Sequence, residues 1–170
     1  LATVLGKDEK TWSEFDDAQM QRVPLMLHIP GYTNGKVSHA YGGEIDVLPT
    51  LLHLVGVDDK NYVHFGTDLL SAKHDQVVAF RNGNFVTPNY TVLGNKTYDN
   101  KSGQILDTEA LGIQKEITKD QDKVKKALSL SDKLNQENLL RFYVPDGFTT
   151  VDPQKIDYQK EAEKLSLIHI

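Results

Sequence analysis

The segment from Val23 to Ile29 is apolar almost without interruption and ends at Pro30-Gly31. A run of this kind predicts a strand buried on both faces of a parallel or mixed sheet, because a half-exposed strand would alternate apolar and polar residues. Such a strand needs a covering layer on each side. The chain is therefore expected to fold as an α/β structure in which other elements flank this strand.

The residues after this strand predict a packed helix. Apolar residues recur there at three- and four-residue spacing until Gly56, where the helix is expected to end: Ile45, Leu48, Leu51, Leu52 and Val55. Pro49 falls early in the helix, where its missing N–H costs little, whereas in the middle it would cost about 3 kcal/mol. Strand and helix together predict an α/β layer over residues 22–75.

The second half of the chain begins with a different sequence pattern. Short β-rich runs separated by Asn-Gly, Gly-Asn and Ser-Gly turns predict an antiparallel meander, with runs at 77–80, 84–86, 90–93, 96–98 and 104–106. An apolar stripe then predicts a long amphipathic helix across that sheet, over residues 113–138. Residues 139–144 are expected to return as a final strand or to end the helix. We thus expect an antiparallel C-terminal subdomain at 76–158.

The two ends of the chain are more polar. Residues 1–21 are predicted to form a short helical lead-in, because Thr11-x-x-Glu14 and Ser13-x-x-Asp16 have the form of capping boxes. Residues 159–170 are expected to be a surface tail. An artefactual origin of its last six residues is left open.

Composition excludes several classes of function. With 170 residues, 39% of them hydrophobic, the chain can form one globular unit. Its net charge of −5 argues against binding of nucleic acid or an anionic membrane, and disfavours polyphosphate-like binding by this segment alone. The absence of cysteine excludes disulfides and thiolate chemistry. No apolar run approaches the roughly 20 residues that cross a bilayer, so any membrane anchor is expected outside these residues.

Four short motifs carry a family resemblance. The apolar run with its Pro30-Gly31 end and the Asp46-x-x-Pro-Thr-Leu-Leu helix resemble the late part of the sulfatase and alkaline-phosphatase superfamily. Phe65-Gly-Thr-Asp-Leu-Leu and Phe80-Arg-Asn-Gly-Asn-Phe narrow the resemblance to lipoteichoic acid synthases, over roughly residues 22–158. The resemblance implies the C-terminal part of an alkaline-phosphatase-like fold, in which a buried strand and helix precede an antiparallel sheet packed against a long helix.

The resemblance also implies a parent activity. Lipoteichoic acid synthases are transferases at the outer side of the bacterial plasma membrane that build polyglycerolphosphate from phosphatidylglycerol. They use a threonine nucleophile and a divalent ion, usually Mn2+, with Mg2+ as the alternative. In that family the nucleophile, the metal ligands and an Asp-His-Tyr-Gly motif precede the part seen here, and no Asp-His-Tyr-Gly occurs in this chain. The resemblance therefore assigns no catalytic residue and no metal ligand, and it makes the upstream part of the same domain the expected partner.

Two residues are candidates for substrate contact. His39 lies in the loop after the predicted strand, where open α/β folds commonly build active sites, although a solvated loop histidine is the simpler interpretation. Arg81 lies at a strand end and could bind a phosphate bidentately. The simpler interpretation is that Asn82-Gly83 forms a type I′ hairpin with Arg81 on its rim.

Other potentially reactive groups have plain interpretations. The six histidines lack the spacing of a shared metal site: His28, His39, His53, His64, His74 and His169. Glu44 and Asp46 could form an acid/base pair, but acidic groups in a first helical turn more simply stabilise the helix dipole by about 0.3–1 kcal/mol. The hydroxyls of Ser38, Thr50 and Thr67 have no plausible base beside them in the sequence.

Two other functions remain open from the residues alone. The chain could belong to a sulfatase or phosphodiesterase hydrolase of the same superfamily, or it could be a noncatalytic cell-surface binding module. In every case the predicted strand and helix would leave apolar faces bare once separated from neighbouring layers, and large apolar patches attract partners. The isolated chain is therefore expected to oligomerise, swap elements or repack, and to be inactive by itself.

Overall fold

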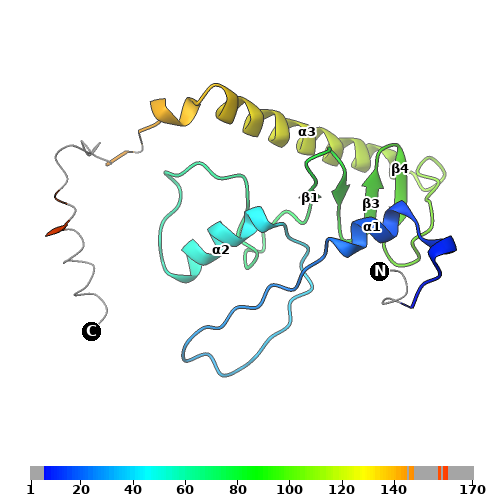
Figure 1. Cartoon of the computed structure of the whole chain (residues 1–170), viewed down its shortest axis with the longest axis horizontal. Coiled ribbons are helices and arrows are strands. Elements are labelled where there is room, and N and C mark those ends of the chain that lie inside the picture. The colour runs from blue at the N-terminus through cyan, green and yellow to red at the C-terminus, as the bar shows by residue number, and fades with distance from the viewer. Residues whose placement is uncertain (1–5, 145, 148–156, 158, 161–170) are drawn as a thin grey trace.

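The computed structural model describes residues 6–144, 146–147, 157 and 159–160. It combines helices with one antiparallel four-stranded sheet in the order β1-β2-β3-β4, so the α/β class is confirmed (Figure 1). The strands are β1 (Val78–Ala79), β2 (Phe85–Val86), β3 (Tyr90–Leu93) and β4 (Lys96–Asp99). The α-helices are α1 (Glu14–Met20), α2 (Val47–Leu54) and α3 (Gln114–Gln136), and the 3-10 helices are η2 (Glu9–Thr11), η3 (Glu44–Asp46) and η4 (Leu139–Phe142).

The predicted meander is confirmed. Consecutive strands pair antiparallel, with Val78 opposite Val86 and Thr91 opposite Tyr98, and a bridge from Tyr98 to Ile105 adds the last of the five predicted runs. The β3–β4 turn has two residues, and its first, Gly94, has φ +59°. Glycine at the first position of a two-residue hairpin turn supplies the positive φ that other residues adopt at a cost.

The β1–β2 turn differs from the prediction. A type I′ turn requires positive φ at both central residues, but Asn138 is the only non-glycine residue of the described chain with a positive φ, so Asn82 does not qualify. The turn instead has three residues, 81–83, closed by bonds from Gly83 N to Phe80 O and from Phe80 N to Asn84 O. Gly83, at φ +86°, takes the left-handed position that ends such a loop.

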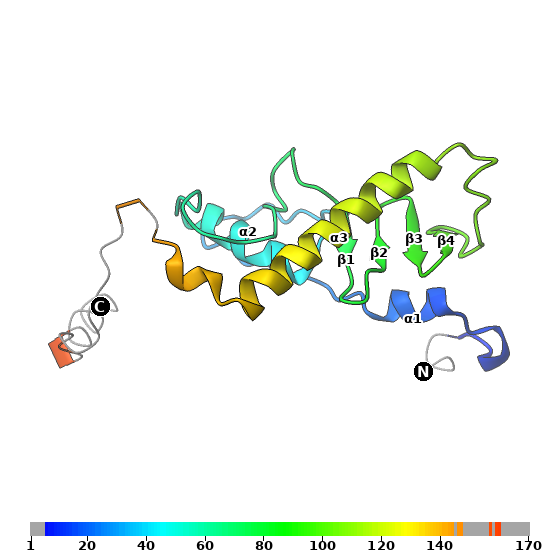
Figure 2. The same cartoon turned by 90° about the horizontal axis from the view of Figure 1, so that it is seen from above.

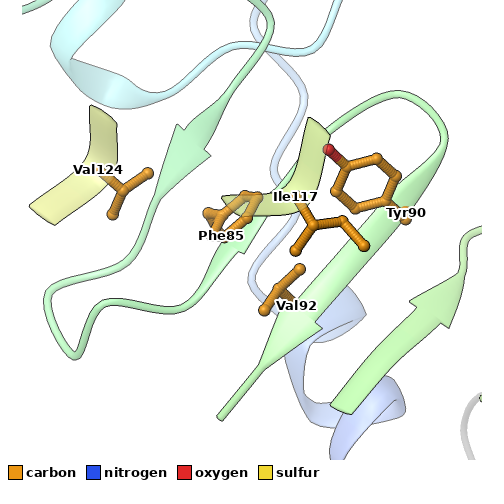
Figure 3. Packing of buried hydrophobic residues seen from close by; sticks show 5 residues of the cluster. All are labelled: Phe85, Tyr90, Val92, Ile117 and Val124. Carbon is orange, nitrogen blue, oxygen red and sulfur yellow. The ribbon is translucent and has the colours of Figure 1, made fainter. Parts of the chain in front are cut away.

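The sheet lies between two helices. Tyr90 and Val92 of β3 point to α3, where they meet Phe85, Ile117 and Val124 in the larger buried cluster (Figure 3). The alternate residue of β3, Leu93, joins the opposite cluster with Tyr98 and the α1 residues Phe15 and Ala18. Figures 1 and 2 show the resulting order of layers, α3 over one face and α1 on the other. The period-two alternation of a strand places its side chains in both cores.

Both flanking helices follow their sequence signals. The predicted helix over 113–138 is observed as α3, and Ile117 and Val124 of its apolar stripe are buried. Helix α1 begins with a capping box in which Ser13 and Asp16 bond each other's backbone N–H groups. The alternative box at Thr11 is not formed, because the Thr11 hydroxyl donates to Asp8 O. Residues 139–142 end the helical region as η4 rather than forming a strand.

The predicted strand over residues 23–29 is wrong. This segment is extended but unpaired and belongs to a long loop between α1 and α2, with Val23 74% and Met26 85% exposed (Figure 1). No strand among the described residues lies beside it to accept its backbone hydrogen bonds, and a strand exists only as part of a ladder. The end of the segment is as expected, since Tyr32 N bonds Ile29 O across Pro30-Gly31, with Gly31 at φ +82°.

The predicted helix before Gly56 does form, as η3 and α2, with Pro49 in its first turn and Gly56 at φ +73° beyond its end. Its apolar stripe is not packed, however, because Ile45, Leu48 and Val55 are between 54% and 71% exposed. The covering layer that the pattern predicts is not supplied by the described residues. Of the predicted C-terminal segments, residues 148–156 and 161–170 lie outside the described chain.

Replacing Tyr90 by phenylalanine tests how α3 is fixed to the sheet. The Tyr90 hydroxyl donates to Asp120 Oδ2 at 2.8 Å, and burial together with this carboxylate raises the pKa of Tyr90. The folded state keeps a proton that the unfolded chain releases near pH 10, so the free energy of unfolding should fall as pH rises past about 10. Tyr90→Phe should lower stability by about 1–2 kcal/mol at neutral pH and reduce this alkaline loss.

Urea unfolding measured between neutral and alkaline pH would check this prediction. Tyr62→Phe is the matched control, because Tyr62 is 55% exposed and should leave the pH dependence unchanged. Parallel stability curves for wild type and Tyr90→Phe above pH 10 would contradict the prediction.

Candidate functional site

The Asp46 carboxylate is the centre of the most tightly bonded part of residues 41–76. It is buried, its Oδ2 accepts a hydrogen bond from Gly43 N at 2.8 Å, and its Oδ1 accepts one from Thr67 N at 2.7 Å. Both oxygens therefore hold backbone N–H groups. This arrangement gives no support to an acid/base pair with Glu44, whose side chain is exposed and takes no part in these bonds.

Thr50 continues this network one helical turn later. Its hydroxyl donates to Asp46 O at 2.6 Å and accepts from Leu69 N at 2.9 Å, and the side chain is fully buried. The residues Gly43, Asp46, Thr50, Thr67 and Leu69 form what we call the Asp46 lock. Of its four hydrogen bonds, two tie the start of α2 to residues 67–69, from Thr67 N to Asp46 and from Leu69 N to Thr50, and the other two lie within residues 43–50. Hydrogen bonds to a carboxylate are stronger than those between neutral groups.

Gly66 allows the two segments of the lock to approach. A Cβ atom at position 66 would lie 1.9 Å from Ile45 O, which is backbone and cannot turn aside. Gly42 is close as well, but there the nearest atom belongs to the flexible Leu69 side chain. Glycine at 66 is thus required by close backbone approach, a reason that the motif Phe65-Gly-Thr-Asp does not reveal by itself.

Thr67 and His74 form a second contact that the sequence did not predict. Thr67 Oγ1 lies 2.6 Å from His74 Nδ1, and His74 Nε2 lies 2.7 Å from the carbonyl oxygen of Tyr41. A carbonyl only accepts, so Nε2 carries a proton, and in the neutral tautomer that has this proton Nδ1 accepts the Thr67 hydroxyl proton. A hydroxyl, a base and an orienting group in this order have the connectivity of an activated nucleophile.

The neighbours of this pair indicate a structural role for it. Tyr41 N also donates a hydrogen bond to the Gln76 side chain at 3.0 Å. The Arg22 guanidinium lies 5.8 Å from the centre of the Tyr41 ring. Arg22 and Tyr41 are the two ends of the loop that holds residues 23–40. His74 therefore fixes the base of that loop to the Asp46 lock.

The two substrate candidates from the sequence lie apart. His39 is exposed in the loop, and no hydrogen bond to it is formed within the described residues. The Arg81 guanidinium is exposed too, but it forms an ion pair with Asp132 of α3. It lines a shallow groove between the β1–β2 turn and α3, together with Lys125 and Lys133. The structure brings Arg81 to cationic neighbours and leaves His39 isolated.

The remaining histidines of the described chain are His28, His53 and His64, while His169 lies outside the described residues. His53 Nδ1 lies 2.7 Å from Asp68 Oδ2, and His64 contacts Asp59 Oδ2 and Gly66 O at 3.0 Å each. His28 lies in the exposed loop. In residues 6–144 and the few described beyond them, no three His, Cys, Asp or Glu side chains are grouped so that they could hold a metal ion.

The comparisons with known proteins give a consistent result. No family model matches the chain. Lipoteichoic acid synthase 2 of Bacillus subtilis (strain 168) is 48% identical over 167 residues, which are 98% of this chain and 24% of that protein. Lipoteichoic acid synthase 1 of the same strain is 49% identical over 163 residues, 96% of the chain and 24% of the relative. The chain is homologous to a segment of the lipoteichoic acid synthases.

A more distant relative extends this result. The lipoteichoic acid synthase of Staphylococcus aureus (strain USA300) is 40% identical over 159 residues, 94% of this chain and 23% of its own length. The chain thus spans about a quarter of the length of these curated lipoteichoic acid synthases. The resemblance predicted from four motifs is confirmed, and the Asp46 lock joins two of the segments that carry it, Asp46 to Leu52 and Phe65 to Leu70.

Proposed function

We propose that this chain forms the C-terminal portion of the catalytic domain of a lipoteichoic acid synthase, a transferase that builds polyglycerolphosphate from phosphatidylglycerol. In this proposal the segment supplies packing surface and positions the loop of residues 22–41, while the nucleophile and the metal ligands belong to other parts of the longer protein. The homology over nearly the whole chain supports the parent activity, and the names of the relatives favour it over a sulfatase-type hydrolase.

The exposed apolar surface of residues 22–55 supports the proposal that this segment packs against other parts of a longer protein. Residues 23–29 pair with no strand of the described chain, and α2 shows an uncovered apolar stripe, although the Asp46 lock fixes the helix. Apolar patches larger than a few hundred Å2 mark interaction surfaces. In the remaining three-quarters of a lipoteichoic acid synthase, a sheet would pair with residues 23–29 and a further layer would cover the apolar stripe of α2. This packing would also complete the alkaline-phosphatase-like fold expected from the motifs.

The divalent ion of the proposed parent enzyme, manganese or magnesium, does not fit the described residues. Hard cations of this kind prefer several oxygen ligands at one place, and nowhere in the described residues are three His, Cys, Asp or Glu side chains grouped in that way. We therefore place the ion outside this segment. None of the described helices is long and apolar enough to cross a membrane. We propose a position at the outer face of the plasma membrane for the parent enzyme.

A chimera tests the proposed function. The 167 residues of Bacillus subtilis lipoteichoic acid synthase 2 that align with this chain would be replaced by it, and release of diacylglycerol from a fluorescent phosphatidylglycerol would be measured. We expect the chimera to be active, the 170-residue chain alone to release nothing, and an enzyme lacking the segment to be inactive. A chimera that melts like the parent enzyme but is inactive, or release by the chain alone, would disprove the proposal.

A further inference from the structure

The outer face of α3 carries a line of lysines. Lys115, Lys119, Lys126 and Lys133 recur at intervals of four and seven residues, which places them on one stripe of an α-helix, opposite the buried Ile117 and Val124. All four side chains are exposed, and none forms an ion pair with another described residue. We call these four residues the lysine ridge. At 1.5 Å per residue it is about 27 Å long.

Two of the four carboxylates of α3 are held on the side of the sheet. Of its four acidic residues, Asp120 accepts the hydrogen bond of the Tyr90 hydroxyl and Asp132 is paired with Arg81, both on the side of the sheet. Asp122 is the acidic neighbour on the ridge side, where Lys123 is also present and paired with Asp75. The net charge of −5 is a sum over the whole chain, so it does not prevent a local excess of positive charge on this face.

The shape of this face is suited to an extended ligand. One shallow groove is lined by Lys115, Thr118, Lys119, Asp122, Lys123 and Lys126. A second groove continues along the C-terminal half of α3, between Lys125, Ser129 and Lys133 and the turn at Arg81. Apart from Leu128, the residues of both grooves are charged, polar or glycine. In Figures 1 and 2, no other element of the described chain covers this side of α3.

We propose that the lysine ridge binds a linear phosphodiester polyanion along α3. The proposal rests on the proposed function, in which the polymer is the polyglycerolphosphate product. Lysine ammonium groups act as point charges for phosphates and tolerate variable spacing, which suits a flexible chain without a fixed conformation. The second groove adds Arg81, whose guanidinium can exchange Asp132 for a phosphate. Binding displaces counterions and therefore weakens with salt.

Fluorescence anisotropy of a fluorescein-labelled synthetic glycerolphosphate oligomer, long enough to span the ridge, would test this with the complete 170-residue chain. The ridge variant carries Lys115→Gln, Lys119→Gln, Lys126→Gln and Lys133→Gln. Glutamine has nearly the helix propensity of lysine, so α3 should keep its circular dichroism. The control variant has the same net charge but changes exposed lysines outside α3: Lys10→Gln, Lys36→Gln, Lys73→Gln and Lys101→Gln.

At low salt the wild type should bind the oligomer. In the ridge variant the Kd should rise at least about tenfold and depend less steeply on salt. The control variant should bind nearly as the wild type does. Equal weakening in both variants, or no binding by the wild type, would overturn the proposal. So would binding to phosphatidylglycerol vesicles without binding to the oligomer, which would assign the ridge to a lipid surface. The chimera tests the proposed function separately, because its diacylglycerol release can be lost while oligomer binding persists, or the reverse.

Discussion

Replacing Phe85 by alanine is expected to lower the free energy of unfolding of the sheet and α3 by about 3–5 kcal/mol. Phe85 is fully buried, lies between β2 and α3, and meets Tyr90 edge to face with ring centres 6.3 Å apart (Figure 3). Truncation would remove the largest of the fully buried side chains and leave a cavity that two short strands cannot close. The loss therefore includes both the transfer energy and the cavity.

Urea unfolding would measure this loss with two probes. Circular dichroism follows α3, while the fluorescence of Trp12, whose indole N–H donates to Asp17 of α1, follows the opposite layer. Both transitions should move to lower urea if the three layers unfold together. The control is Phe142→Ala, because that ring is 69% exposed and its removal should change stability by no more than about 0.5 kcal/mol. Similar midpoints for Phe85→Ala and Phe142→Ala would contradict this account of the core.

Asp46→Ala is expected to open the Asp46 lock at a cost of about 2–4 kcal/mol, because it leaves the N–H groups of Gly43 and Thr67 without acceptors in a buried place. Asp46→Asn should cost less, since its one carbonyl oxygen still accepts. Glu44→Ala is the matched control from the same short helix. If the helix dipole were the main effect, both Asp46→Ala and Glu44→Ala would cost only about 0.3–1 kcal/mol.

Hydrogen exchange would report the opening locally. The amides of Gly43, Thr67 and Leu69 should exchange faster in Asp46→Ala, whereas those of β3 should keep their protection because the sheet packs through other residues. Unchanged protection at Thr67 in Asp46→Ala would show that the lock does not depend on the carboxylate.

The elements that the sequence predicted correctly are those specified by near neighbours in the chain. The apolar stripe of α3, the positions of the turns in the meander and the capping box of Ser13 and Asp16 each depend on residues within a few positions of one another, although the type of the β1–β2 turn was predicted wrongly. Helical periodicity, turn residues and caps act at that range. Their agreement with the structure extends to within two residues at the ends of α3.

The prediction of a strand at residues 23–29 was wrong because an apolar pattern does not show which strand would pair with the segment. An apolar run shows that burial would be favourable, but ladder hydrogen bonds need a neighbouring strand that local sequence does not identify. The same reason explains why α2 forms and yet shows its apolar stripe. Cap, proline position and terminal glycine specify the helix locally, while its covering layer is a tertiary property.

The candidate site was predictable only in outline. Asp46 was assigned a structural role, but through the dipole of the helix rather than through the buried N–H groups it holds. The pairing of Thr67 with His74 spans seven residues of irregular loop, where no periodicity predicts contacts. Arg81 meets Asp132 across 51 residues, so its partner follows only from the packing of α3 on the sheet.

The position of α1 against the sheet has a consequence for the order of folding. Phe15 stacks on Tyr98 with ring centres 5.7 Å apart, although the whole segment of residues 22–75 lies between them in the chain. The meander closes through turns of two or three residues and can form early, whereas docking of α1 must first close a long loop. Since doubling the length of such a loop adds only about 0.6 kcal/mol of closure entropy, the segment between α1 and β1 can lengthen or shorten at little thermodynamic cost to the layered core.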